Sequence, residues 1–258
     1  MTLKAKIFAK FANLYFSRMS SEERIVRLGL NTSPNKISDI VVMPASEFYV
    51  RHLTKNLNVK SFGYTWRSKN PDYSLISSGI GAPSAAFYIE ILRRANVKVI
   101  VRVDFAGSIN PSLKSGDFFV PIRAVNADGT SKIYDPESKE SYPDDGLKNL
   151  IKETLMKLNV PYKEGVIYSH DAIFKEDAEF IKQLKQNDID AIDMETAVLY
   201  TLGKQFNIKT CSLLIISNSA EEGFEKEIST VTAEFFDALD LSVKIIPEII
   251  KAIRHAGL

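Results

Sequence analysis

Cysteine is almost missing from this chain of 258 residues, which carries only Cys211. A single cysteine excludes an intramolecular disulfide and any zinc site built from several thiolates, and it fits a reducing compartment. The three histidines, His52, His170 and His255, are scattered without the spacing of metal ligands. We therefore expect no metal site and a cytoplasmic location, with Cys211 as a small buried hydrophobic residue.

Long apolar runs and an excess of charge are missing as well. No run approaches the roughly 18 residues of a membrane span, and the formal net charge of +1 gives no bulk attraction to nucleic acid. Hydrophobic residues make up 45% of the chain and charged residues 25%, as in ordinary globular proteins. The composition predicts a globular protein that has neither a membrane nor a nucleic acid as its partner.

Residues 1–20 are basic and amphipathic, so residues 1–24 are predicted to form an N-terminal helix ahead of the main domain. Lysines separate apolar positions at helical spacing, and these positions are Leu3, Ile7, Phe8, Phe11, Leu14 and Tyr15. Such a helix either lies on a membrane surface or docks on its own domain or on a partner subunit. We favour docking.

Apolar runs alternate with amphipathic segments along the rest of the chain. Strands are predicted at residues 39–43, 73–78, 97–103, 118–125, 166–168 and 210–217. Helices are predicted at residues 46–57, 85–95, 147–158, 196–206 and 230–253, with Pro247 kinking or breaking the last one. Residues 126–145 are polar and are predicted to form an exposed loop. The alternation, without repeats or a linker, predicts one α/β domain over residues 25–258.

Two carboxylates flank a methionine at Asp193, Met194 and Glu195, between an apolar run and a predicted helix. Burying charge costs several kcal/mol unless each carboxylate finds hydrogen-bond donors. The vicinal hydroxyls of a sugar supply such donors, and the methionine can lie against the sugar's apolar face. The alternative is a solvated strand end before an N-capped helix, where the helix dipole favours Glu195.

A glycine-rich turn and a strand-end arginine suggest ligand contacts. Residues 79–84 lead from a predicted strand into a helix, which brings backbone N–H groups against an anion or another ligand. Arg102 lies near the end of the β-branched run 97–103, where a buried arginine is costly unless it meets an anion. Ligands of open α/β sheets bind at that edge, so we expect Arg102 to hold one.

Five short segments, in order along the chain, resemble the nucleoside phosphorylase-I family, which holds purine nucleoside and uridine phosphorylases and related nucleosidases. They are residues 78–84 (SGIGAPS), Arg102 with residues 106–109 (AGSI), residues 116–117 (GD), residues 169–174 (SHDAIF) and residues 193–195 (DME). The resemblance implies a single-domain three-layer αβα sandwich around a mixed, barrel-like central sheet. It also implies homo-oligomers, from dimers to hexamers, and no cofactor apart from inorganic phosphate as co-substrate.

The resemblance also implies a role for individual residues. Ribose contacts fall to Asp193, Met194, Glu195 and Arg27, phosphate contacts to Arg102, Gly81 and Phe105, and base contacts to Ile173, Phe174, Asn218 and Ser219. Arg102, Glu195 and Asn218 are the implied catalytic residues. Arg27 lies near the place where uridine phosphorylases have a histidine that reaches a neighbouring subunit's ribose. Asn218 replaces an aspartate that protonates the leaving purine, and an amide cannot protonate it.

Three departures from the family pattern concern phosphate. The family's Gly-Asp-Pro-x-Arg loop appears here as residues 45–49 (ASEFY), without its arginine. A second arginine, which the family contributes across the dimer, aligns near Ser61. The usual Gly-Thr after Arg102 is replaced by Asp104 and Phe105, and a carboxylate beside a phosphate repels it.

Three functions follow from these matches and departures. The first is a nucleoside phosphorylase that gives free base and ribose 1-phosphate. The second is a nucleosidase that uses water, because residues 43–48 (MPASEF), 128–131 (DGTS) and 193–197 (DMETA) are similar to AMP nucleosidase. In that case Arg27 would meet a nucleotide 5′-phosphate, whereas the nucleosidases do not keep Arg102. The third is a catalytically inactive nucleoside-binding paralogue, which the altered phosphate loop suggests.

Overall fold

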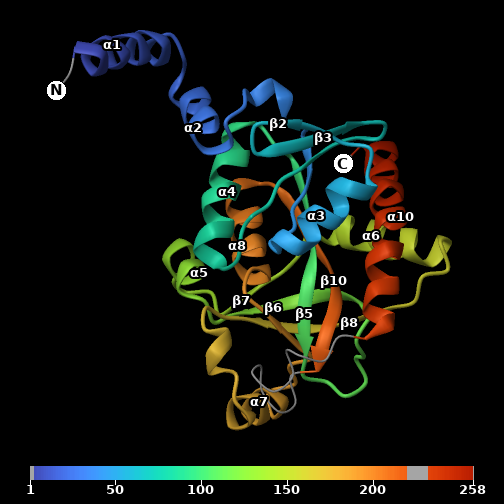
Figure 1. The fold of residues 1–258 in the computed structure, drawn as a ribbon. Helices are drawn as coiled ribbons and strands as arrows, with labels where there is room; N and C mark the ends of the chain where they lie inside the picture. Colours follow the sequence, from blue (N-terminus) through green and yellow to red (C-terminus); the bar gives the residue numbers. More distant parts are fainter. Residues whose placement is uncertain (1–2, 220–231, 258) are drawn as a thin grey trace.

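The computed structural model describes residues 3–219 and 232–257 (Figure 1). Over this part of the chain ten strands form one sheet: β1 (Ile40–Val42), β2 (Lys60–Phe62), β3 (Thr65–Lys69), β4 (Asp72–Leu75), β5 (Val99–Ser108), β6 (Phe118–Asn126), β7 (Glu140–Ser141), β8 (Tyr162–Ser169), β9 (Ala191–Asp193) and β10 (Lys209–Ser219). The described helices are α1 (Leu3–Ser17), α2 (Ser21–Leu30), α3 (Glu47–Asn56), α4 (Ala82–Arg94), α5 (Gly129–Tyr134), α6 (Asp145–Lys157), α7 (Ala178–Lys185), α8 (Thr196–Phe206) and α10 (Ala233–Ala256), with short 3₁₀ helices η1 (Pro34–Lys36) and η2 (Ile173–Lys175).

The sheet closes on itself at one end. Its strand order is β10-β6-β8-β9-β5-β1-β4-β3-β2, and β10 also pairs in parallel with β5 over nearly the whole length of both strands. Strands β5, β9, β8, β6 and β10 therefore form a closed ring, and β1 to β4 extend from it as an open sheet. Closure removes unpaired edges, and the mixed strand directions fit the predicted barrel-like sheet.

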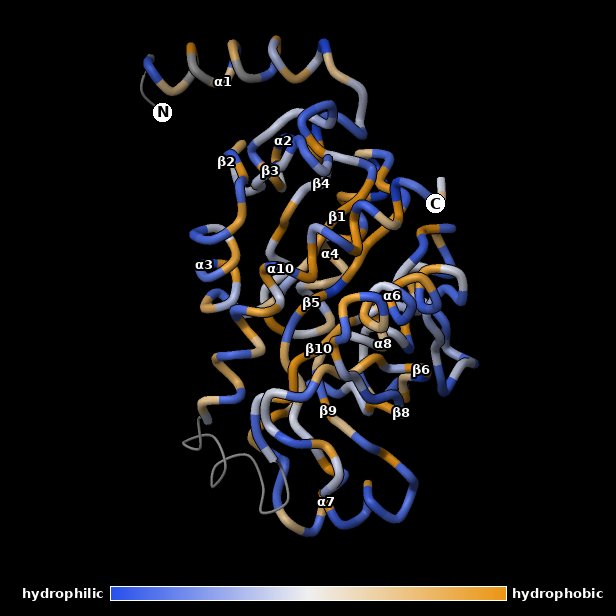
Figure 2. The backbone as a smooth tube through the Cα atoms, turned by 90° about the vertical axis from the view of Figure 1, so that its right-hand side faces the viewer, coloured by the Kyte–Doolittle hydropathy of each residue, from blue (hydrophilic) through white to orange (hydrophobic). Residues whose placement is uncertain are grey.

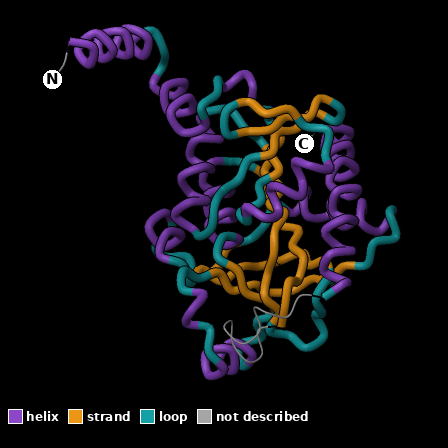
Figure 3. The backbone as a smooth tube through the Cα atoms, viewed as in Figure 1, coloured by secondary structure: helices purple, strands orange, loops and turns teal. Residues whose placement is uncertain are grey.

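Two hydrophobic cores lie on opposite faces of the sheet. One contains buried residues of α2, α4 and α8, and the other contains buried residues of α3, α6 and α10. Figure 1 shows the first group of helices on one side of β5 and β10 and the second group on the other, and Figure 3 shows the strands between them. Apolar segments line the inside of this arrangement in Figure 2. The predicted three-layer αβα fold is confirmed.

Helix α8 is buried along most of its length, and its first residue follows the Asp193–Glu195 motif directly. It packs against α4, α5, β6 and β10. The close approach to β10 depends on Gly203, since a Cβ there would lie 2.6 Å from Thr210 Cγ2. Helix α8 is thus held rigidly, and so is the motif at its start.

The described elements depart from the predicted ones at several places. The segment 126–145 is not only a loop, because α5 and β7 lie within it and pack on α8. Pro247 does not break α10, whose flanking Ile245, Ile246, Ile249 and Ile250 are all buried and hold the helix in place. Strands β2 and β3 and helix α7 were not predicted. The predicted start of the last helix, Thr230, lies outside the described residues.

The N-terminal segment forms two helices rather than one. Helix α2 begins after Ser20, whose side chain accepts a hydrogen bond from the Glu23 N–H, so residue 24 lies inside this helix. Helix α1 stands off the body in Figure 1, and Ile7, Phe11 and Leu14 are about half exposed or more. Within the described chain α1 does not dock on its own domain. No described helix is long and apolar enough to cross a membrane.

Candidate active site

A cavity of about 400 Å³ lies where the carboxyl-terminal halves of β5 and β10 meet the start of α8. The loops after β1 and β4 and the 3₁₀ helix η2 complete its walls. Seven of the predicted residues line this cavity: Arg102, Phe105, Ile173, Asp193, Met194, Glu195 and Asn218. These residues come from four separate parts of the chain that the fold brings together, as expected for ligands that bind beyond strand ends.

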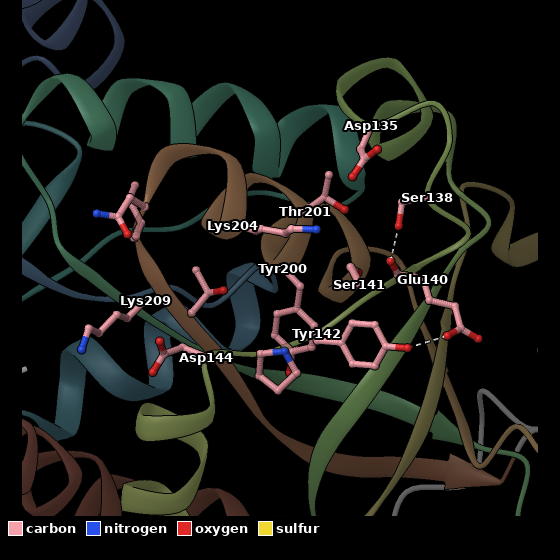
Figure 4. A pocket seen from close by; sticks show the side chains of 15 residues that line it. Asp135, Ser138, Glu140, Ser141, Tyr142, Asp144, Tyr200, Thr201, Lys204 and Lys209 are labelled. Carbon is pink, nitrogen blue, oxygen red and sulfur yellow. Dashed lines mark hydrogen bonds between the residues drawn. The ribbon is translucent and has the colours of Figure 1, made fainter.

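A second cavity, of about 490 Å³, lies at the other end of α8 (Figure 4). Its walls come from the segment 135–144, the end of α8 and the start of β10, and they include Lys204, Lys209 and Asp144. None of the predicted site residues lines it. Asp144 caps α6 by accepting the Leu147 N–H at 2.8 Å, so this carboxylate has a structural role. The smaller cavity is therefore the candidate site.

Arg102 forms the centre of the candidate site and is only 1% exposed. Its guanidinium lies 2.5 Å from Glu195 Oε2, 3.1 Å from Asp193 Oδ2 and 3.5 Å from Asp104 Oδ2. Burial by itself would lower the pKa of Arg102, but these three carboxylates raise the pKa above its ordinary value. Arg102 is thus a permanently charged group that the protein's own anions already surround.

Glu195 is held in a fixed position by two donors. The Gly81 N–H donates to Oε1 at 2.6 Å and Arg102 donates to Oε2 at 2.5 Å. Gly81 has φ +93°, which favours glycine, and this conformation points its N–H at the carboxylate. Burial raises the pKa of Glu195, Arg102 lowers it in part, and Asp193 and Asp104 raise it again. Each oxygen keeps acceptor capacity for a ligand hydroxyl.

Asp193 is used mainly by the protein itself. Its Oδ1 accepts from the Ser169 hydroxyl at 2.5 Å, and its Oδ2 accepts from the Thr196 N–H at 3.0 Å and the Thr196 hydroxyl at 2.5 Å. Together with the Arg102 contact, these bonds give Oδ2 three partners and Oδ1 one. We propose that Asp193 positions Arg102 and the start of α8, in place of the ribose contact that the resemblance implied.

Asp104 is the residue whose surroundings the sequence did not reveal. Its Oδ2 accepts the backbone N–H of Ala45 at 2.5 Å and that of Ser46 at 3.3 Å, at the start of α3. Arg102 and Asp104 are two residues apart on β5, so both side chains point to the same face of the strand. Asp104 is 3% exposed, and burial raises the pKa of its carboxyl, against the lowering effect of Arg102.

Apolar side chains form the wall next to these charges. The Phe105 ring stacks on Tyr49, with centroids 5.0 Å apart, and meets Phe235 edge-on at 5.1 Å. Ile80 and Met194 also line the cavity. A flat heterocycle and the apolar face of a sugar both fit such a wall. Phe105 thus lines the cavity while its ring packs into the core beside α3 and α10, at a position where the resemblance implied a phosphate contact.

Four predicted residues do not line the cavity. Phe174 is 75% exposed, and Ser219 lies at the end of β10 beyond the wall. Gly81 is not among the residues that line the cavity, but its backbone N–H donates to Glu195. Arg27 lies in another hollow beside Tyr64 and pairs with Glu23 at 2.8 Å. Its implied contact belongs to a neighbouring subunit, so that role stays a prediction.

Glu176 is a cavity residue that the sequence reasoning missed. It is 8% exposed and lies 2.8 Å from His170 Nε2. The spacing of six residues between His170 and Glu176 carried no recognisable signal. His170 is thus hydrogen-bonded within the protein. Among the described residues no cluster of His, Cys, Asp or Glu has the geometry to hold a metal ion.

A family model described as the phosphorylase superfamily matches residues 39–253. The chain is 24% identical over 228 residues to a DeoD-type purine nucleoside phosphorylase of Thermoanaerobacter, covering 84% of this chain and 97% of the relative.

Two solved structures share the fold. A uridine phosphorylase from Vibrio fischeri superposes with a TM-score of 0.74 at 24% identity, over 84% of this chain and 93% of the other. An AMP nucleosidase from Bacteroides thetaiotaomicron superposes with a TM-score of 0.72 at 22% identity, over 91% of this chain and 99% of the other. The similarity thus extends to enzymes of both kinds.

Proposed function

The chain belongs to the phosphorylase superfamily, and from this premise we propose that it cleaves the N-glycosidic bond of a nucleoside with water. One observation carries the choice of water over phosphate. The Asp104 carboxylate already takes the two backbone N–H groups at the start of α3 and faces Arg102. These are the donors that an inorganic phosphate would need at this edge of the sheet.

The charge of the site supports the same choice. Among the residues that the structure describes, one guanidinium faces three carboxylates, those of Asp104, Asp193 and Glu195. A phosphate dianion entering this cavity would meet an excess of negative charge at short range, where the low dielectric screens it little. A water molecule is uncharged and meets no such repulsion.

Negative charge beside the sugar suits the reaction. Cleavage passes through an oxocarbenium-like sugar, and fixed carboxylates stabilise the positive charge that develops there. Glu195 accepts from ribose hydroxyls in this proposal, and Met194 lies against the sugar's apolar face. Both side chains line the cavity, and Glu195 is fixed by Gly81 and Arg102 before any ligand arrives.

The leaving base lies against the aromatic and apolar wall in this proposal, with Asn218 at its polar edge. The Asn218 amide accepts from the Ser217 hydroxyl at 2.6 Å and donates to the Ser219 carbonyl at 2.9 Å. An amide donates a hydrogen bond to the base but no proton. Asn218 thus favours bases that leave without strong acid assistance from the protein.

Base release from a panel of nucleosides and AMP, with and without inorganic phosphate, tests the proposal. Hydrolysis gives free base and ribose at a rate that phosphate does not raise. Analysis of the sugar product separates ribose from ribose 1-phosphate. A rate that depends on phosphate would refute hydrolysis, and no release from any nucleoside would favour the nucleoside-binding paralogue. Preference for AMP would support a contact between Arg27 and the 5′-phosphate.

Phosphorolysis is the second candidate function. The presence of Arg102 supports it, as does the similarity to a purine nucleoside phosphorylase. It requires Arg102 to exchange a carboxylate partner for phosphate, and the phosphate-dependent arm of the same assay detects it. In either case we propose a cytoplasmic homo-oligomer, with Arg27 facing the site of a neighbouring subunit.

A further inference from the structure

We propose that Asp104 is the base that deprotonates the attacking water, and that its carboxylate is also what keeps inorganic phosphate out of the site. This inference rests on the proposed hydrolysis and names the residue that carries it. The family pattern has glycine where this chain has Asp104. The contacts of Asp104 in the structure suggest a function for this replacement.

The donors around Asp104 make a ready anion site. Two consecutive backbone N–H groups at the start of the ten-residue helix α3 point at Oδ2, and Arg102 approaches the same oxygen. Backbone N–H groups at a helix start and an arginine are the usual partners of a bound oxyanion. Here strand β5 supplies the anion, which is covalently attached and always present. A free phosphate must displace it before it can bind.

The position of Asp104 relative to the sugar site suits a base. The same guanidinium nitrogen, Arg102 Nη2, lies 2.5 Å from Glu195 Oε2 and 3.5 Å from Asp104 Oδ2. Asp104 is therefore next to the carboxylate that holds ribose in the proposed function. Both carboxylates line the cavity together with Met194. A water held by Asp104 is thus adjacent to the bound sugar.

The step balances with the groups present. The Asp104 carboxylate takes one proton from water, and the water oxygen forms the bond to the anomeric carbon. The bond from that carbon to the base nitrogen breaks, and its electron pair goes to the base. The base takes a proton from solvent, and Asp104 later returns its own proton to solvent. The products are free base and ribose, and no other reactant is consumed.

Burial of Asp104 fits this role as supporting evidence. It raises the pKa of the carboxyl, which makes the carboxylate a better proton acceptor than an exposed aspartate. The backbone N–H groups and Arg102 keep the ionised form available. The net effect on the pKa of Asp104 is upward, toward a stronger proton acceptor.

The test compares Asp104→Asn with Asp104→Gly. The asparagine keeps the shape and an oxygen acceptor but cannot take a proton, so hydrolysis should fall by about 10²-fold or more while KM changes little. The glycine removes the internal anion and leaves the donors, so inorganic phosphate should raise the melting temperature of this variant but not that of the wild-type protein. Asp104→Ala repeats the second measurement in case glycine weakens β5.

Asp190→Asn is the matched control. Its carboxylate also accepts a backbone N–H, from Val166 at 2.8 Å, but lies outside the cavity. This variant should keep the wild-type rate and gain no response to phosphate. Circular dichroism confirms that each variant is folded.

The outcomes separate this inference from the proposed function. Wild-type protein that releases no base refutes the function, while the phosphate response of Asp104→Gly and Asp104→Ala still tests the anion site. Wild-type hydrolysis that persists in Asp104→Asn refutes the base. Failure of phosphate to stabilise either the glycine or the alanine variant refutes the role in keeping phosphate out.

Discussion

Replacing Arg102 by methionine should destabilise the protein strongly and in a pH-dependent way. The guanidinium is 1% exposed and lies within 3.5 Å of three buried carboxylates. Methionine fills much of the same volume but leaves those carboxylates without the one cation that pairs with them among the described residues. Breaking a buried ion pair by removing one partner costs about 3–5 kcal/mol. For a chain of this size that corresponds to a fall in melting temperature of about 6–20 °C.

The pH dependence follows from the sign of the pKa changes. Arg102 lowers the pKa of both Asp104 and Glu195 in the folded protein, so removing it raises both values further above those of the unfolded chain. Groups with raised folded pKa values contribute stability that is present at low pH and lost as the pH rises through those values. The deficit of Arg102→Met should therefore be largest at alkaline pH and shrink toward pH 5.

Urea denaturation of wild type and variant at several pH values measures the deficit. Arg51→Met is the control, because Arg51 pairs with Glu47 at 3.0 Å and both side chains are well exposed. That pair should be worth about 1 kcal/mol or less. A loss of unfolding free energy in Arg102→Met that is as small as in the control, or that is independent of pH, would refute the conclusion that Arg102 offsets the charge of the buried carboxylates.

Three further predictions follow from other contacts. Glu195→Gln should lower the rate of base release by about 10²-fold while the protein stays folded, and a variant that unfolds instead would assign Glu195 a structural role. Burial raises the pKa of Glu195 to about 7, so base release should fall as the pH drops below that value and the carboxylate is protonated; a pH-rate profile that is flat from 5 to 8 would contradict this. Gly203→Ala should cost about 1–3 kcal/mol, because the added Cβ meets Thr210 on β10, and an unchanged melting temperature would show that α8 and β10 separate easily.

The repeating parts of the fold were predictable from local pattern. Apolar runs with β-branched residues gave β1, β5, β6 and β10, and periodic segments gave α3, α4, α6 and α8, to within a few residues. The prediction failed where distant contacts decide the structure. Helix α5 and strand β7 have polar sequences, and they are ordered because they pack on α8 and pair with β6. A local pattern contains no sign of such partners.

The candidate site was predictable to a similar extent. Arg102 and Glu195 were predictable because buried charge next to a strand end needs partners, and the structure brings the two side chains within 2.5 Å of each other. The partners themselves were not predictable. Asp104 meets Ala45 across 59 residues of sequence, and only the fold shows that this carboxylate accepts two backbone N–H groups and faces Arg102. The sequence alone indicated repulsion of phosphate, which is a weaker statement.

The two faces of strand β5 have different roles, one in packing the core and one in the candidate site, and this has an evolutionary consequence. Val99, Val101 and Val103 belong to the core beside α3, α6 and α10, whereas Arg102 and Asp104 point to the opposite face. Position 104 therefore changes without altering that valine layer. Under the proposed function, a lineage that exchanges the residue at position 104 would change which nucleophile the site accepts without changing the valines that pack the core.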